Sequence, residues 1–183
     1  MEFESTAIAD VLLIKPRVHR DQRGFFTETY RRSVFAEHGI NEIFVQDNLS
    51  SSVRHTLRGL HYQIKQQQAK LVSVTLGEIL DVAVDLRRDS PTFAKHVMCR
   101  LSAEGREMLY IPGGFAHGFF VLSSQAVFSY KCSDYYCPEA ERGIRWNDPD
   151  LAIPWPEDTP VLSEKDRSLP YLADLLRADL PGF

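Results

Sequence analysis

The feature that most constrains the fold is a series of short apolar runs separated by turn sequences. The runs are Val11–Ile14, Phe25–Tyr30, Ile43–Val45, Leu57–Ile64, Leu71–Leu76, Ile79–Leu86, His96–Leu101, Met108–Ile111, Phe115–Leu122 and Ala126–Cys132. Turn residues such as Gly77-Glu78, Pro112-Gly113-Gly114 and Ser123-Ser124 stand between them. This spacing is typical of an antiparallel β-sandwich or barrel.

Helical signals are few. Ser33–His38, which precedes Gly39, predicts a short helix, and Leu169–Ala178, with Ser168 as N-cap, predicts a second one near the end of the chain. Residues 147–160 contain too many prolines for either element, so we expect an ordered loop there. The sequence thus predicts an all-β protein with a few short peripheral helices.

Size and charge narrow the class of protein. The chain has 183 residues, 44% of them hydrophobic, which is enough for one well-buried core, so we expect residues 1–183 to form a single domain. The formal net charge is −4 and no block of Lys and Arg occurs, which argues against nucleic acid as a partner. The N-terminus does not resemble a signal peptide, and no apolar run approaches membrane-spanning length. We therefore expect a cytoplasmic protein with no membrane contact.

Several ionisable side chains fall on strand faces that are otherwise apolar, because side chains alternate between the two faces of a strand. The shared faces are those of Lys70 with Val72, Val74 and Leu76, of His117 with Phe115, Phe119 and Val121, and of Tyr130 with Phe128. Each residue alone is explained by a place at a strand end, or by a core hydrogen bond for His117. Because three coincidences occur together with His61, we favour a reactive site inside a β-barrel.

Two segments resemble degenerate cupin motifs. The first begins at Gly59 and contains His61, and the second is Pro112-x-Gly114-x-x-His117. A metal-binding cupin presents a His-x-His pair, a glutamate and a final histidine. Here Gln63 takes the second position of the pair, and the region expected to supply the glutamate contains Lys70. Two potential ligands beside a cation make a poor site for a divalent metal, so we expect the barrel to function without one.

The cysteines do not indicate a metal site either. There are three, Cys99, Cys132 and Cys137, and none forms a C-x-x-C pair. An odd number without that spacing indicates neither a disulfide framework nor a cysteine zinc site, so we expect buried structural thiols.

A set of segments in a fixed order carries a wider resemblance. They are Asp21–Glu28 (DQRGFFTE), Gln46–Asn48, Leu57–Gln63 (LRGLHYQ), Lys70–Val72, Asp81–Arg87, Ser90–Phe93, Ile111–Phe119 (IPGGFAHGF), Tyr130–Lys131, Gly143–Pro149 (GIRWNDP) and Leu162–Asp166 (LSEKD). Through them the chain resembles, over nearly its whole length, the dTDP-4-dehydrorhamnose 3,5-epimerases of deoxysugar biosynthesis. The resemblance implies a cupin-type jelly-roll fold, an isomerase without a cofactor, and a dTDP-4-keto-6-deoxyhexose substrate.

The chemistry of such a substrate agrees with the ionisable residues. A keto group at C4 acidifies the protons at C3 and C5, and inverting those centres needs a base on one face, an acid on the other and a cation at the enolate oxygen. The resemblance implies that His61 is the base and that Asp166 is the carboxylate that orients it. It further implies that Lys70 stabilises the enolate and that Tyr130 is the acid.

Other residues are implied around this centre. His117 is expected to line the same pocket and to hold the sugar. Asp81 and Asp85, which share a strand face, stay open as alternative carboxylates for the base. Arg58 precedes the base by three residues, so a regular strand would send the two side chains to opposite faces, and a bulge at Gly59 would bring them together.

The nucleotide diphosphate of the substrate implies a second group of residues. Planar guanidinium groups bind phosphate oxygens bidentately, and Arg23 and Arg58 match the family's phosphate-binding arginines. Tyr136 is expected to stack on thymine, with Phe26 lining that pocket. The remaining substrate-binding residues implied by the resemblance are Glu28, Gln46, Asn48, Glu141 and Lys165.

The resemblance also implies a homodimer in which N-terminal strands cross over, so that Arg23, Phe26 and Glu28 serve the neighbouring subunit's site.

Other functions stay open. Relatives within the class epimerise only C3 or only C5, or act on other nucleotide-linked 4-keto-deoxysugars. A metal-dependent cupin oxygenase or isomerase is a second enzyme class. Non-enzymatic sugar-nucleotide binding is disfavoured, because a binding site needs no acid and base around a cation.

Overall fold

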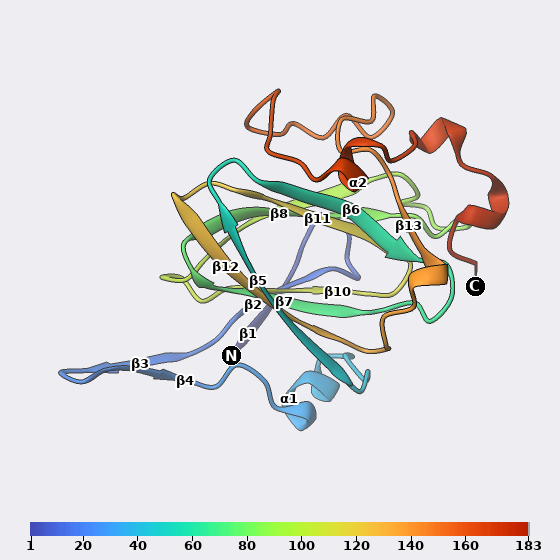
Figure 1. Cartoon of the computed structure of the whole chain (residues 1–183). Coiled ribbons are helices and arrows are strands. Elements are labelled where there is room, and N and C mark those ends of the chain that lie inside the picture. The colour runs from blue at the N-terminus through green and yellow to red at the C-terminus, as the bar shows by residue number, and fades with distance from the viewer. Residues whose placement is uncertain (183) are drawn as a thin grey trace.

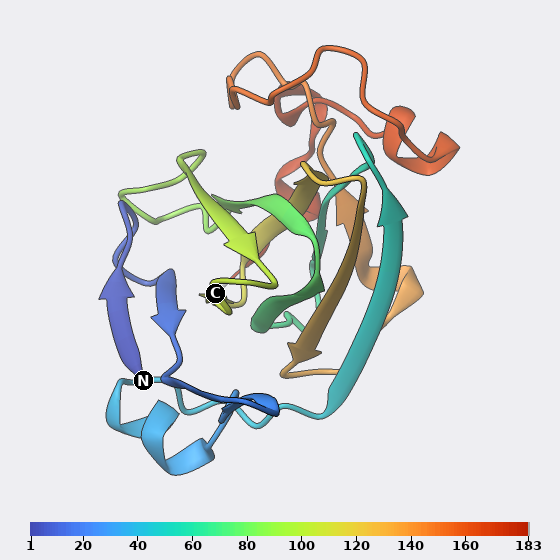
Figure 2. The same cartoon turned by 90° about the vertical axis from the view of Figure 1, so that its left-hand side faces the viewer.

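Residues 1–182, described by a computed structural model, form two facing antiparallel sheets with a separate hairpin (Figures 1 and 2). The six-stranded sheet has the order β1 (Glu2–Ser5), β2 (Leu12–Lys15), β10 (Met108–Ile111), β7 (Lys70–Leu76), β12 (Gln125–Cys132) and β5 (Gln46–Val53). The five-stranded sheet has the order β13 (Glu141–Gly143), β6 (Leu57–Gln63), β11 (Phe115–Val121), β8 (Glu78–Asp85) and β9 (His96–Ser102). The hairpin consists of β3 (Val18–Asp21) and β4 (Gly24–Thr27). The predicted all-β jelly-roll fold is confirmed.

The main core lies between the two sheets. Val72 and Val74 of β7 and Phe128 of β12 pack there with Phe115 and Phe119 of β11, and each is at most 4% exposed. These are the faces that period-two alternation assigns to the interior. The polar residues that share those faces are therefore directed inward as well.

Two further apolar clusters cover the outer faces of the sheets. Phe35 and Ile40 pack with Leu71 and Tyr110 on the outside of the six-stranded sheet. Residues 144–155, together with Leu172 of the C-terminal segment, cover Leu60, Tyr62 and Val84 on the outside of the five-stranded sheet. The ordered loop expected at residues 147–160 is confirmed, since this segment contains no helix or strand.

The helical predictions have mixed outcomes. The helix expected at Ser33–His38 is present as α1 (Arg32–Glu37). The helix expected at Leu169–Ala178 is wrong: the chain forms α2 (Glu164–Arg167) and three-residue 3₁₀ turns at Leu172–Asp174 and Arg177–Asp179. Ser163 caps α2, and Leu172 and Leu175 pack against the body at a spacing of three, the 3₁₀ period. Another 3₁₀ turn spans Pro138–Ala140. Among the described residues, no helix is long and apolar enough to cross a membrane.

Strand predictions fail where the sequence is polar or the strand is short. The strand expected at Ile43–Val45 is wrong, because β5 begins directly after that run, at Gln46. The inner face of β5 carries serines and an asparagine. The four-residue β1 and β3 and the three-residue β13 are also absent from the predicted set. An edge strand that borders an aqueous cavity needs no continuous apolar face. A hydrophobic pattern therefore does not predict β5.

The predicted bulge in β6 is confirmed. β11 pairs His117 with His61 and Phe119 with Arg58, so three steps along β6 oppose two steps along β11. Gly59 has a φ of +122°, and a Cβ atom there would lie 2.6 Å from the Gly118 Cα atom. Only glycine therefore fits this close approach of β6 to β11.

Candidate active site

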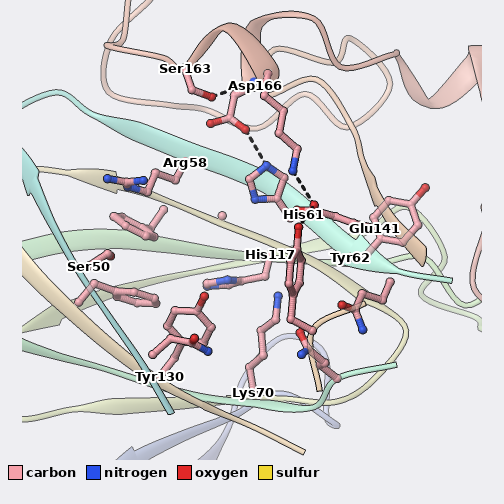
Figure 3. Close-up of a pocket in the computed structure, with 18 of the residues that line it drawn as sticks. Ser50, Arg58, His61, Tyr62, Lys70, His117, Tyr130, Glu141, Ser163 and Asp166 are labelled. Carbon is pink, nitrogen blue, oxygen red and sulfur yellow. Dashed lines mark hydrogen bonds and ion pairs between the residues drawn. The ribbon is translucent and has the colours of Figure 1, made fainter. Parts of the chain in front are cut away.

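A cavity of about 420 Å³ opens between the two sheets (Figure 3). β5, β7 and β12 form one wall, β6 and β11 form the other, and α2 and β13 contribute further residues. The lining residues are Asn48, Leu49, Ser50, Arg58, His61, Tyr62, Gln63, Gln68, Lys70, His117, Gly118, Phe119, Phe128, Tyr130, Tyr136, Glu141, Ser163, Lys165 and Asp166. Most of the site residues expected from the sequence thus meet in one place, although they come from across the chain.

His61 and Asp166 form a close pair at this cavity. His61 Nε2 lies 2.6 Å from Asp166 Oδ1, and the side chains are 30% and 5% exposed. The Asp166 amide donates to the Ser163 hydroxyl at 3.0 Å, which caps α2 and fixes the carboxylate. Burial opposes ionisation of Asp166, but hydrogen bonds and charge from His61 outweigh it, so the pKa of this carboxyl is lowered. The ionised carboxylate orients the imidazole.

Lys70 stands on the opposite wall, at the start of β7 (Figure 3). Burial lowers the pKa of its ammonium, and Cys132, Asp81 and Glu141 offset this only in part. The buried carboxylates of Asp166 and Asp81 are paired with histidines rather than with this ammonium. A half-buried cation in this setting gains stability from any anion that forms beside it.

Tyr130 lies on the same sheet as Lys70, two residues before the end of β12. Its ring contacts Phe128 with ring centroids 5.4 Å apart, and its hydroxyl faces the cavity (Figure 3). Burial raises the pKa of Tyr130, and Cys132 and Glu141 raise it further while Arg58 opposes them. The phenol is therefore protonated near neutral pH and is able to donate a proton.

His117 and Asp81 form a second, fully interior pair. His117 Nε2 lies 3.0 and 2.9 Å from the two carboxylate oxygens of Asp81, and the imidazole stacks on Phe128. Asp85 bonds instead to Arg87, Ser90 and Thr92, at the end of β8. Neither of the alternative carboxylates is therefore the partner of His61, and Asp166 is.

Arg58 and the polar edge of β5 border the cavity. The Arg58 Nε atom donates to the Ser52 hydroxyl at 3.0 Å and the Nη2 atom to the Ser51 carbonyl at 3.4 Å, and the side chain lines the cavity. Gln46 does not line the cavity itself. It donates to Asn48 Oδ1 at 3.1 Å and accepts from the Tyr136 amide at 2.9 Å, so it fixes two residues that do line it.

Tyr136, Glu141 and Lys165 form a connected group at the rim. The Tyr136 hydroxyl and the Lys165 ammonium both donate to Glu141 Oε2, each at 2.6 Å. The hydrogen bond to Glu141 raises the pKa of Tyr136 to about 12. Burial opposes ionisation of Glu141, but its bonds to Lys165 and Tyr136 outweigh burial and lower the pKa of the carboxyl.

Three expected site residues lie away from this cavity, on or next to the β3–β4 hairpin that extends from the body (Figure 1). Arg23 is 90% exposed and pairs with Asp21. Phe26 is 71% exposed, and Glu28 pairs with Arg31. The chain does not bring these three residues to its own cavity.

Several lining residues are absent from the predicted set. Gln63 shares its strand face with His61, so a period of two was a signal for it. Its amide accepts from the Cys137 amide at 2.8 Å and donates to the Gln66 carbonyl at 2.7 Å, which fixes the loop that carries Tyr136. Ser163 stands three residues before Asp166, the spacing of a helix cap. Ser50 stands two residues after Asn48 and Gln68 two residues before Lys70, so the same period was a signal for both.

The described residues contain no cluster of three or more His, Cys, Asp and Glu side chains that could hold a metal ion. The three cysteines are free thiols, and Cys132 is buried while Cys99 and Cys137 are half-buried.

The cavity offers a histidine base on one wall, and a protonated phenol and an ammonium on the other. Such a set is suited to moving protons at a carbon next to a carbonyl.

Comparison with known proteins agrees with this geometry. The family model for dTDP-4-dehydrorhamnose 3,5-epimerase matches residues 5–174. A dTDP-4-dehydrorhamnose 3,5-epimerase of Pseudomonas aeruginosa is 57% identical over 178 residues, covering 95% of this chain and 97% of the relative. A dTDP-4-dehydrorhamnose 3-epimerase of Streptomyces niveus is 38% identical over 182 residues, covering 98% of this chain and 88% of the relative.

Solved structures give the same result. The crystal structure of dTDP-6-deoxy-D-glucose-3,5-epimerase from Legionella pneumophila, in complex with dTDP-4-keto-L-rhamnose, superposes with a TM-score of 0.96. The two proteins are 47% identical, and the match covers 100% of this chain and 98% of the other. The chain therefore belongs to the dTDP-4-dehydrorhamnose 3,5-epimerase family and is an isomerase.

Proposed function

We propose that the chain epimerises dTDP-4-keto-6-deoxy-D-glucose at C3 and C5, giving dTDP-4-keto-L-rhamnose, and that it uses no cofactor. The observation that carries the proposal is that His61 and Tyr130 border one cavity from opposite sheets, with the Lys70 ammonium beside it. A charged nucleotide sugar does not cross a membrane unaided, so we place the enzyme in the cytoplasm.

His61 removes the proton in the first half of the reaction. With the Nε2 hydrogen donated to Asp166, the Nδ1 lone pair is left to accept a proton from C3 or C5 of the sugar. The electron pair of the broken C–H bond passes into the C4 carbonyl and gives an enolate. Asp166 then stabilises the imidazolium that forms.

Lys70 stabilises the enolate oxygen. Its ammonium is on the wall opposite His61, and burial lowers its pKa, so a new anion beside it relieves an unfavourable environment. The resulting stabilisation is larger for the enolate than for the neutral ketone, which is the condition for catalysis.

Tyr130 completes the inversion from the other face of the ring. Its hydroxyl proton is transferred to the carbon, the enolate electron pair forms the new C–H bond, and the C4 carbonyl is restored. Solvent then returns a proton to the phenolate and removes one from the imidazolium. The raised pKa of Tyr130 keeps the phenol protonated until the enolate has formed.

The nucleotide diphosphate occupies the rim in this proposal. Arg58 binds phosphate oxygens, and Tyr136 stacks on thymine with Glu141 and Lys165 beside it. The other members of the site are Gln46 and Asn48 at the edge of β5 and His117 near the sugar.

The hairpin supports a homodimer with exchanged N-terminal strands. Phe25 and Phe26 are 46% and 71% exposed, and apolar side chains of this size are costly to leave in water. Leu49 and Val53 on the outer face of β5 are also exposed. We expect the hairpin to cross to the neighbouring subunit, where Arg23, Phe26 and Glu28 complete its cavity.

Mixing a variant without the base and a variant with weakened substrate binding, assayed well below KM, tests this arrangement. In a heterodimer of His61→Asn and Arg23→Ala chains, the subunit with an intact His61 receives an intact Arg23 from its partner. We expect activity to return after the two proteins are mixed and refolded together. If Arg23 serves its own subunit, each site keeps one defect and mixing restores nothing. A dilute monomer with full activity in sedimentation would also contradict the exchange.

Epimerisation at C3 alone is the alternative that the 38% identical Streptomyces relative favours. Incubation with dTDP-4-keto-6-deoxyglucose in D₂O distinguishes the two. One deuterium at C3 and one at C5, with both centres inverted, supports the proposal, and exchange at C3 alone supports the alternative.

A metal-dependent cupin reaction is disfavoured because Gln63 and Lys70 occupy places where such a site has ligands. The direct test is overnight chelation followed by an activity assay. We expect no loss of activity. A loss that zinc, iron or manganese reverses would overturn the cofactor-free mechanism.

A further inference from the structure

One oxygen atom at the rim of the cavity holds two side chains from different parts of the chain. Glu141 Oε2 accepts from the Tyr136 hydroxyl and from the Lys165 ammonium, both at 2.6 Å. The Glu141 side chain is 16% exposed, whereas Tyr136 and Lys165 are about half exposed. Short bonds to a charged acceptor are the strong class of hydrogen bond, so this oxygen fixes the two side chains relative to each other.

Lys165 is directly followed by Asp166, and the two residues point to different parts of the site. The Lys165 ammonium reaches Glu141. The Asp166 carboxylate reaches His61 (Figure 3). Their helix, α2, has only four residues. A helix this short has little stability of its own, so its side-chain contacts and its Ser163 cap decide where it lies. A shift of Lys165 therefore shifts Asp166.

A second connection runs through the strands. β13 pairs with β6 so that Glu141 lies opposite Gln63 and Gly143 lies opposite His61. A Cβ atom on Gly143 would lie 2.7 Å from the Leu169 side chain, so the segment after α2 packs directly on this pair of strands. Glu141 and His61 are thus held by the same two-stranded ladder and by the same short helix.

We propose that Glu141 and Lys165 are positioning residues that couple the nucleotide to the catalytic base. A base stacked on Tyr136 holds the tyrosine hydroxyl on Glu141, and Lys165 carries this constraint to α2, where Asp166 orients His61. The inference rests on the proposed function, since it takes Tyr136 as the platform for thymine. Its consequence is that the thymidine diphosphate part of the substrate tightens the His61–Asp166 pair before the sugar reacts.

Tyr136→Phe tests the coupling without removing the platform, because it keeps the ring and deletes only the hydroxyl bond to Glu141. Hydrogen exchange of the backbone amides of residues 163–168 is measured with and without saturating dTDP. We expect dTDP to slow this exchange about tenfold in the wild type and less than about twofold in Tyr136→Phe. Equal slowing in both proteins would overturn the proposal.

This measurement needs no turnover. A wild-type chain that fails to epimerise the keto sugar overturns the proposed function, and the exchange data still decide the coupling. The two failures are therefore distinguishable.

Kinetics provide a readout that a merely local binding role would not give. We expect Lys165→Met to lower kcat about tenfold at saturating substrate, and Lys165→Arg, which keeps the ion pair to Glu141, to stay within about threefold of wild type. The double variant Tyr136→Phe with Lys165→Met should be no slower than Lys165→Met alone, since both changes interrupt one connection. Effects confined to KM, or effects on kcat that multiply in the double variant, would overturn the coupling.

Discussion

The interior of the cavity and its rim hold their side chains in different ways. In the interior, His61, Lys70 and Tyr130 stand on regular strands within the two sheets. At the rim, Tyr136 comes from a loop, and Glu141 and Lys165 come from a three-residue strand and a four-residue helix. The interior is fixed by long backbone ladders, whereas the rim is fixed by the short pairing of β13 with β6 and by a few side-chain bonds.

This difference indicates that the interior and the rim of the cavity have different roles. Proton transfer tolerates little error in position, which suits groups carried by paired strands. Nucleotide binding tolerates more adjustment, which suits side chains carried by a loop and by short elements. Substitutions in the interior should therefore change the rate of the chemical step, and substitutions at the rim should change binding or transmit smaller effects inward.

The largest effect is expected for His61→Asn. Without the base no enolate forms, so both epimerisation and solvent deuterium incorporation should fall by about 10³-fold or more. The dissociation constant for dTDP, measured by calorimetry, should change little, because the rim is untouched. Deuterium uptake at the wild-type rate would show that another group is the base.

Tyr130→Phe should have the next largest effect, on inversion alone. His61 still removes a proton and returns one to the same face, so the substrate gains deuterium in D₂O while it keeps its configuration. Inversion should fall about 10²-fold, as NMR of the C3 and C5 positions would measure. Near wild-type inversion would assign the acid to another residue or to water.

Arg58→Ala examines the boundary between the two regions, since Arg58 is carried by β6 but its guanidinium reaches the opening. The diphosphate is bound in both the ground state and the transition state, so KM and the dTDP dissociation constant should rise about 10- to 100-fold with a small change in kcat. Arg54→Ala, on the exposed turn after β5, is the matched control. A loss confined to kcat would contradict a phosphate role.

The interior was the part of the site that the sequence could predict. Lys70, His117 and Tyr130 share strand faces with core residues, so a period of two is enough to predict the direction of their side chains. The bulge at Gly59 followed from the need to bring Arg58 and His61 to one face. Side chains of a regular strand alternate between two faces, so their directions can be predicted from the order of the residues.

The rim and the chain ends were less predictable. Short side-chain bonds, such as the one between Glu141 and Lys165, depend on where two distant segments meet and leave no local pattern. The C-terminal helix failed because tertiary packing of Leu172 and Leu175 selected 3₁₀ turns over the helix that the local pattern favoured. β5 was missed because its inner face borders the cavity and is polar.

Glu141→Gln tests whether the rim acts on the interior through its charge. Glu141 raises the pKa of both Lys70 and Tyr130, so its removal lowers both. Activity at high pH is lost when either group loses its proton. The alkaline limb of kcat/KM should therefore move to lower pH. Glu139→Gln, an exposed neighbour outside the cavity, should leave the limb unchanged, and a shift to higher pH in Glu141→Gln would contradict the assignment.

Ser163→Ala should have the smallest effect. It tests the position of α2 without changing a group that transfers a proton. The hydroxyl caps the helix that carries both Lys165 and Asp166 but takes no part in proton transfer. Loss of such a cap costs about 1 kcal/mol, which corresponds to a fall in Tm of about 2–4 °C for a chain of this size. Because the Asp166 bond to His61 remains, kcat should fall only about two- to threefold. Ser168→Ala, at the other end of α2, is the control and should change kcat less. A fall as large as that of His61→Asn would mean that the cap, and not the His61–Asp166 bond, decides where the base lies.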